Sequence, residues 1–139
     1  MIQRIQTVWL FLAALFAALT FKLPFYSGNV VNKENVQQYE KLVASSNFLV
    51  LIFTAGLVVG TIIMIFLYKN RKQQMWLIAA AAGLSIINIV IYFTELKKFV
   101  SGNMSLTAVF ALAIPVFLLL AINGIWKDEK LVKSLDRLR

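Results

Sequence analysis

Four long apolar segments constrain this 139-residue chain more than any other feature of its sequence. They cover approximately residues 5–23, 47–68, 75–94 and 106–126. A helix of about twenty residues matches the hydrocarbon core of a bilayer, because each residue adds about 1.5 Å and the core is about 30 Å thick. The segments lack the alternating polarity of barrel strands, and a helix satisfies its own backbone groups in lipid. The sequence therefore predicts an all-α fold, a four-helix transmembrane bundle, in a single domain over residues 1–139.

The distribution of basic residues predicts the orientation of this bundle. Lys69, Arg71 and Lys72 crowd into the short turn between the second and third segments. Short cytoplasmic loops carry an excess of Lys and Arg, so this turn is expected in the cytoplasm and, with four spans, so are both termini. Arg4, these three and the five basic residues of 127–139 make nine of the fourteen in the chain. The formal net charge of +8 is expected to face anionic lipid headgroups rather than nucleic acid.

The residue inventory excludes several kinds of chemistry. The chain has no cysteine and no histidine, so it offers no disulfide, thiolate nucleophile, imidazole base or metal site built on those residues. No ionisable residue lies deep within an apolar segment. Glu95 comes nearest, beside Lys97 and Lys98 at the outer end of the third segment; we interpret it as an interfacial charge, with a proton or cation site as the alternative. We expect no enzymatic activity and no cofactor.

Small residues at four-residue spacing predict where helices pack closely. Gly56 and Gly60 lie on the second segment, and Ala79 and Gly83 lie on the third. Such pairs form flat faces on which two helix backbones approach each other in a membrane. We expect the two faces to meet within one chain, in a hairpin of the second and third segments. A contact between two chains, and therefore a homo-oligomer, is the alternative.

Two other residues within the segments have expected structural roles. Asn88 is the deepest amide, and because its side chain needs a partner in hydrocarbon, it should face the other helices and bond one of them. Pro115 lacks a backbone N–H and should bend the fourth segment near Ala111.

Residues 22–46 form the long connection on the outer side. Val36, Tyr39 and Val43 recur there at three- and four-residue spacing, after Asn32, which is a favourable N-cap residue. This pattern predicts a short extracytoplasmic helix lying over the outer ends of the bundle, with a partner-binding element as the alternative. The shorter outer connection, residues 97–103, is expected to be a tight turn.

The charged end of the chain has a helical pattern of its own. Leu131, Leu135 and Leu138 recur at four- and three-residue spacing, while charged residues fill the other face. This predicts an amphipathic cytoplasmic helix, residues 127–139, that continues from the fourth segment, with Glu129 and Lys133 spaced to pair. Its leucines either enter the headgroup layer or bury against a partner protein. The residues expected to contact cytoplasmic lipid or a partner are Arg4, Lys69, Arg71, Lys72, Lys130, Leu131, Lys133, Leu135, Arg137 and Leu138.

The two ends of the chain also carry a family resemblance. "MIQRIQTVWL" at the start and "KDEKLVKSLDRLR" at the finish resemble an uncharacterised bacterial family of small four-span membrane proteins, domain of unknown function 4293. The resemblance covers the whole chain and implies a bacterial cell (inner) membrane location with cytoplasmic ends. It implies no activity and no functional residues. Because the polar residues around Gln6 and those of 127–139 fall on one side of the predicted topology, we expect them to meet there.

These observations lead to two hypotheses of function. The first is a non-enzymatic accessory or assembly subunit of a bacterial membrane complex, which other membrane proteins recognise through helix faces and the charged tail. The second is a small oligomeric transporter or channel whose path is lined by Glu95, Asn88 and the bend at Pro115, although carriers usually hold a carboxylate well inside a span.

Overall fold

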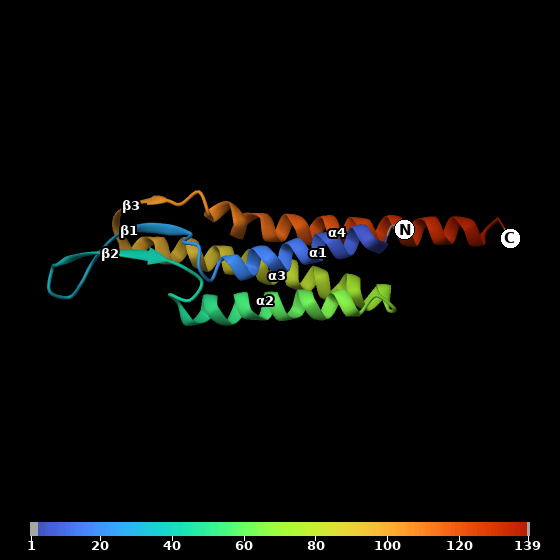
Figure 1. Cartoon of the computed structure of the whole chain (residues 1–139), viewed down its shortest axis with the longest axis horizontal. Helices are drawn as coiled ribbons and strands as arrows, with labels where there is room; N and C mark the ends of the chain where they lie inside the picture. The colour runs from blue at the N-terminus through green and yellow to red at the C-terminus, as the bar shows by residue number, and fades with distance from the viewer. Residues whose placement is uncertain (1–2, 139) are drawn as a thin grey trace.

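The computed structural model describes the backbone of residues 3–138 and the side chains of residues 5–138. It is mostly helical, as predicted, and it also contains a small sheet (Figure 1). The long helices are α1 (Gln3–Leu19), α2 (Phe48–Phe66), α3 (Arg71–Glu95) and α4 (Ala108–Asp136). The strands are β1 (Tyr26–Val31), β2 (Gln37–Leu42) and β3 (Phe99–Met104), and a short 3-10 helix, η1 (Leu96–Lys98), joins α3 to β3.

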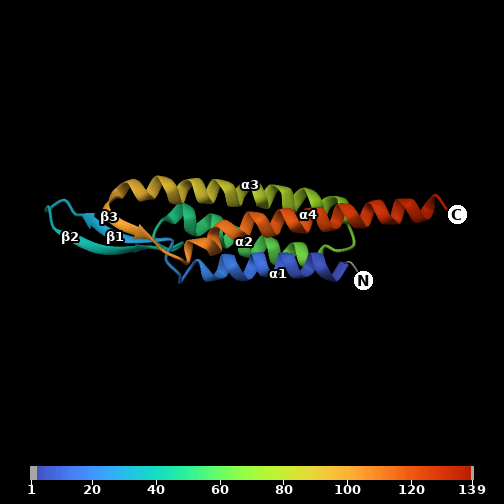
Figure 2. The ribbon, with the colours of Figure 1, turned by 90° about the horizontal axis from the view of Figure 1, so that it is seen from above.

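The long helices lie side by side, and the sheet extends from one end of them (Figures 1 and 2). Helices α1 and α3 each pack against both α2 and α4. We call the end that carries the strands the sheet end. The opposite end, which holds the start of α1, the α2–α3 turn and the last turns of α4, is the tail end.

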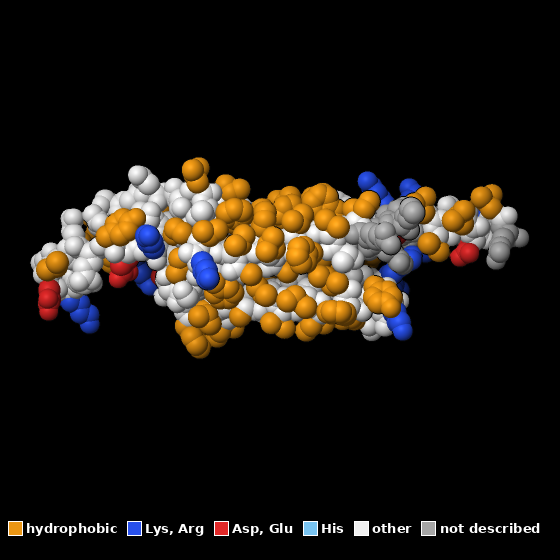
Figure 3. Space-filling view, viewed as in Figure 1, with side chains coloured by type: hydrophobic (Ala, Val, Ile, Leu, Met, Phe, Trp, Pro, Cys, Tyr) orange, Lys and Arg blue, Asp and Glu red, His pale blue; other side chains and the backbone are white. Residues whose placement is uncertain are grey.

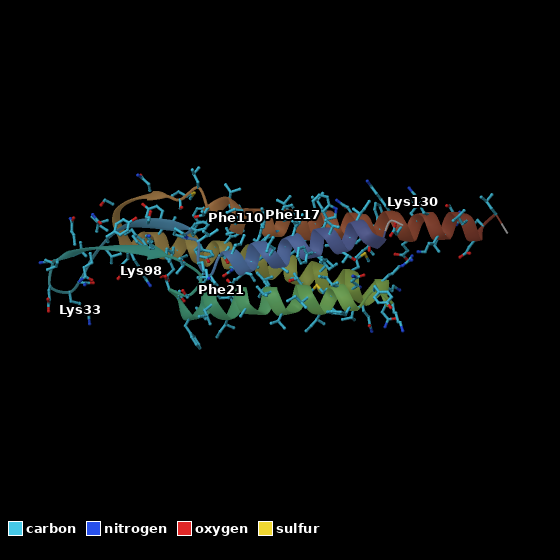
Figure 4. All side chains as sticks on the ribbon, viewed as in Figure 1. Phe21, Lys33, Lys98, Phe110, Phe117 and Lys130 are labelled. Carbon is cyan, nitrogen blue, oxygen red and sulfur yellow. The ribbon has the colours of Figure 1, made fainter. Side chains whose placement is uncertain are left out.

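Small side chains allow α1 and α4 to approach closely. Ala13 and Ala17 on α1 and Ala121 on α4 are fully buried, as are the larger Leu10 and Leu118 around them. Alanine lets two helix backbones come near each other, which is how helices associate where no water is present to drive hydrophobic burial. Phenylalanine rings of α1 and α4 continue this contact, and Figure 4 labels two of those on α4, Phe110 and Phe117.

Three of the helices are long and apolar enough to cross a membrane, by length and composition. They are α2, α3 and α4. Helix α1 is shorter, with its apolar stretch at Ile5–Leu19. The predicted first span reached Leu23, but the helix ends at Leu19, where turns begin with the Phe21 N–H donating to the Ala18 carbonyl. Helical backbone is also disfavoured at Leu23, because Pro24 follows it. Apolar side chains cover the outside of the helices, and charged ones gather toward the two ends (Figure 3).

The outer connection is a sheet, so the predicted extracytoplasmic helix is wrong. Strands β1 and β2 form an antiparallel hairpin, and its turn contains Asn35 in the left-handed region (φ 58°), which Asn tolerates better than most residues. Val36 and Tyr39 remain 52% and 63% exposed, so their helical spacing does not mark a buried face. In β2 only Leu42 is buried.

The second outer connection is also a strand rather than the predicted tight turn. After η1 the chain forms β3, which pairs antiparallel with β1, so the strand order is β2-β1-β3. Gly28 and Gly102 face each other across this pair, and a Cβ on either would overlap the backbone of the neighbouring strand. Glycine is therefore required at both positions.

Phe25 fixes the sheet to the helices. Its ring is 2% exposed and stacks on Tyr92 of α3, with 4.6 Å between ring centroids. Its backbone N–H donates to the carbonyl of Leu42 at 2.7 Å, and its carbonyl accepts from the N–H of Ser105 at 3.1 Å. The sheet thus covers the end of α3, which runs alongside it (Figure 2).

Helix α4 is unbroken from Ala108 to Asp136, so Pro115 does not interrupt it. At about 1.5 Å per residue its 29 residues span about 43 Å, more than the thickness of a hydrocarbon core. The last turns run past the other helices and along the same axis (Figures 1 and 2). We call residues 127–138 the α4 extension. The predicted helical continuation of the fourth segment is confirmed.

Candidate functional site

A buried polar cluster joins three helices toward the sheet end. Asn88 of α3 faces the neighbouring helices, as expected, and its Nδ2 donates to Oγ1 of Thr54 on α2 at 3.0 Å. The phenol of Tyr92 is within hydrogen-bonding reach of Thr54 and also of Thr20, just after α1. All four side chains are at most 6% exposed. Polar side chains away from water are stable only when they bond one another, so this cluster fixes the relative positions of α1, α2 and α3.

The direction of part of the hydrogen bonding in this cluster is fixed. The hydroxyl of Thr20 donates to the carbonyl of Ala17 at 2.6 Å, which uses its single proton. Toward Tyr92, Thr20 can therefore act only as an acceptor, while Asn88 donates to Thr54. Oδ1 of Asn88 is a buried acceptor with no partner among the described residues.

A second polar contact joins α1 to α4 at the tail end. Nε2 of Gln6 donates to Oδ2 of Asp128 at 2.7 Å, and the two residues are 7% and 6% exposed. A Cβ at position 124 would lie 3.0 Å from Cγ of Gln6, so Gly124 makes room for this side chain. The expected meeting of the two polar ends therefore occurs, and Asp128 is its acceptor. The side chain of Arg4 lies outside the described residues.

The small-residue faces of α2 and α3 do not meet each other. A Cβ added at Gly56 or Gly83 would find no atom within 4 Å, and Ala79 is exposed. The hairpin contact predicted for these faces within one chain is therefore not formed. The two helices meet instead through other residues, including Gln74, whose Nε2 donates to the carbonyl of Met64 at 2.9 Å. The buried Gln and Thr side chains were not predicted, because the predicted helix contacts relied on the spacing of small residues. The signal that could have found them is the recurrence of polar residues at helical spacing.

The α4 extension carries apolar side chains that no described residue covers. Leu131, Val132, Leu135 and Leu138 are 50%, 44%, 66% and 85% exposed. Their spacing places them on one side of the helix, and we call them the apolar stripe. Asp128, one turn before Leu131 and Val132, is the last residue of α4 that packs in the interior. The stripe thus begins where the contact between α1 and α4 ends.

Basic residues surround the base of the α4 extension. Lys69, Arg71 and Lys72 lie at the α2–α3 turn, and the charges of the latter two reach Glu129 on α4. Glu129 accepts a hydrogen bond from Lys133, the pairing expected from their spacing, with Nζ 2.8 Å from Oε1. This bond, the charge of Lys133 and those of the α2–α3 turn hold the pKa of Glu129 below its ordinary value. The tail end therefore presents a positive field, and the negative charge of the ionised Glu129 is balanced by these cations.

The ionisable candidate of the sequence lies at the end of α3. Oε2 of Glu95 is 2.6 Å from Nζ of Lys98, so its charge is paired at the sheet end, which agrees with the interfacial interpretation. Within residues 5–138, no group of three carboxylates could hold a metal ion. Ser85 donates to the carbonyl of Ala82 in its own helix.

Membrane-length apolar helices, a carboxylate paired at the sheet end and buried bonds that join helices define a helical protein of membrane type. The chain belongs to the family described as "Domain of unknown function (DUF4293)", whose model matches residues 2–138. No curated protein and no solved structure matches the chain.

Proposed function

We propose that the protein is a non-enzymatic integral membrane subunit that serves the assembly or attachment of a membrane complex. In this proposal all four long helices cross the bacterial inner membrane as a bundle, with the tail end in the cytoplasm and the sheet on the outer side. Lys69, Arg71 and Lys72 support this orientation, because basic residues concentrate in short cytoplasmic turns.

The observation that carries this proposal is the uncovered apolar stripe of the α4 extension. The interior contacts of Asn88 with Thr54 and of Gln6 with Asp128 bond helices to one another. Glu95, the carboxylate at the end of the predicted third span, is paired with Lys98. The surfaces that remain free to contact a partner include the stripe at one end and the outward small-residue faces of α2 and α3.

Co-purification after gentle extraction tests this proposal. The tagged chain, expressed at its natural level and extracted in a mild detergent, is expected to bring down a partner in a fixed ratio, measured by quantitative mass spectrometry. A tagged unrelated four-span protein from the same membrane is the control. If the chain migrates alone in several mild detergents, the proposal is wrong.

A further inference from the structure

We propose that the α4 extension is a docking site for an amphipathic helix of another protein, one whose apolar face is bordered by acidic residues. This inference rests on the proposed function and identifies the chemistry of the partner. The apolar stripe, Leu131, Val132, Leu135 and Leu138, is the contact surface. A row of basic residues beside it selects the partner by charge.

The stripe continues an interface that the chain itself uses. Helix α4 packs against α1 and α3 through side chains at three- and four-residue spacing, which end with Ile125 and Asp128. Val132 and Leu135 extend that spacing by two more turns, but no described element lies against them. A helix that lines up with this face would extend the existing packing rather than require a new kind of contact.

A basic row runs along one border of the stripe. Lys127, Lys130, Ser134 and Arg137 follow one another at three- and four-residue spacing, so they share a face next to Leu131 and Leu138. All four are exposed. The ion pairs formed by the described residues are those of Glu95 with Lys98 and Glu129 with Lys133, so the three cations of this row have no carboxylate. Figure 4 shows Lys130 on the part of α4 beyond the other helices.

The direction of the extension argues against the membrane surface as its occupant. The extension continues along the axis of the helices instead of turning across it (Figures 1 and 2). A helix that buries its apolar face in the headgroup layer lies in the plane of that layer. Leu135 and Leu138, two to three turns past Trp126, are therefore carried away from the bilayer and into the cytoplasm of the proposed topology.

Charge argues against a second copy of the chain. Asp128 is bonded to Gln6 and Glu129 to Lys133, which leaves Asp136 as the unpaired carboxylate of the described extension. A second extension would bring one free carboxylate and three more free cations. A helix with Glu or Asp bordering its leucines satisfies both the stripe and the row.

A fluorescence experiment tests the partner chemistry on the full chain in lipid nanodiscs. The sequence has no cysteine, so Leu138→Cys carries a single environment-sensitive dye, and Lys133→Cys on the opposite face is the control. The probes are two designed helical peptides with identical leucines, one flanked by Glu and one by Lys. We expect the acidic peptide to shift the dye at position 138 to the blue with saturable, micromolar binding, and the basic peptide to leave it unchanged.

Two sets of variants separate the apolar and the charged contributions. Replacing two stripe leucines, Leu131→Ser with Leu135→Ser, is expected to weaken binding of the acidic peptide by about tenfold or more. Reversing two charges, Lys130→Glu with Arg137→Glu, is expected to transfer binding to the basic peptide. Circular dichroism of each variant checks that the helices remain folded. Equal binding of both peptides to the wild-type chain would overturn the proposal.

Three outcomes would assign the surface differently. A blue shift without peptide in discs of anionic phosphatidylglycerol, but not in neutral phosphatidylcholine, would show that lipid covers the stripe. Dimers in detergent that disappear with the leucine replacements would show that a second copy does. If the co-purifying partner stays bound to a chain that ends at Trp126, the docking site is wrong and the proposed function stands.

Discussion

At each end of the molecule one helix extends beyond the bundle, and the two extensions differ in whether the chain covers them. At the sheet end, α3 runs past its neighbours and the chain covers it with its own strands, through Phe25 on Tyr92. At the tail end, α4 runs past its neighbours and nothing in the described chain covers Leu135 or Leu138. The chain therefore has the means to bury such a surface, and it uses them at one end only. An end left uncovered in this way is suited to meeting another molecule.

The largest expected effect comes from removing the cover at the sheet end. Phe25→Ala deletes a ring that is 2% exposed and stacked on Tyr92, and it should lower the free energy of unfolding by about 3 to 5 kcal/mol. Amides of the strands should exchange faster as the sheet detaches. Unfolding in mixed micelles and hydrogen exchange measure both. Tyr39→Ala, an exposed aromatic of the same sheet, should change stability by no more than about 0.5 kcal/mol; equal losses would contradict the anchoring role.

The contact between Gln6 and Asp128 should give the next largest effect, at the tail end. Asp128→Leu leaves the Gln6 amide buried without an acceptor, which costs about 1 to 3 kcal/mol. Asp128→Asn keeps an acceptor oxygen at the same place and should lose clearly less. Unfolding of the two variants in mixed micelles makes the comparison, and similar losses would show that the hydrogen bond is not what holds α1 to α4.

Breaking the hydrogen bonds of the buried cluster around Asn88 should lower the free energy of unfolding by somewhat less. Thr54→Val keeps the shape of the side chain but separates Asn88 from Tyr92, and interhelical bonds of this kind are worth about 0.6 to 1.7 kcal/mol in membrane proteins. Thr94→Val is the matched control, because that hydroxyl is exposed and bonds the Ile91 carbonyl of its own helix. A loss that is no greater for Thr54 than for Thr94 would remove the cluster as a link between helices.

Substitutions in the apolar stripe should hardly change the stability of the isolated chain. Leu135→Ser alters a side chain that is 66% exposed and should change the free energy of unfolding by no more than about 0.5 kcal/mol, in contrast to Phe25→Ala. The same unfolding assay applies. A loss as large as that of a core residue would mean that the chain covers its own tail end, and the difference between the two ends would disappear.

The smallest expected effect concerns pH at the base of the extension. The pKa of Glu129 is held down by its hydrogen bond from Lys133 and by nearby cations, so the pair supports the helix above the ordinary glutamate pKa. That support is lost as the pH falls through the lowered pKa of the folded chain. Lys133→Gln should raise the pH at which Glu129 titrates, measured by carbon NMR of its carboxyl group. An unchanged titration would show that the pair does not form in solution.

Sequence patterns predicted the long helices well because twenty apolar residues in a row have few other solutions. The continuation of α4 and the pair of Glu129 with Lys133 follow from the same short-range periodicity. The strands could not be found this way, since Val36 and Tyr39 have helical spacing but stay exposed, and their pairing with β1 is a long-range choice. A turn signal at Asn35 between two short segments would have been the better indication.

The helix faces show a different limit of the sequence. Gly56 and Gly83 mark where a backbone can be approached, but not by which helix, and the structure turns them outward. Gln6 and Asp128 are far apart in the chain, so only their common side of the predicted topology pointed to a meeting. Their burial depends on Gly124, because a side chain at that position would press against Gln6. Pairwise geometry of this kind is absent from any local pattern.

The bond between Gln6 and Asp128 also sets a distance. If α4 slid along α1 by one turn, about 5.4 Å, the Asp128 carboxylate would lose its donor, so α4 keeps its place along the bundle. Leu138 is the tenth residue after Asp128, so it lies about 15 Å past that contact along the helix axis. The bond to Gln6 therefore fixes how far the apolar stripe lies beyond the other helices. In the proposed topology, any molecule that uses the stripe therefore binds within this distance of the Gln6–Asp128 contact, on the cytoplasmic side of the membrane.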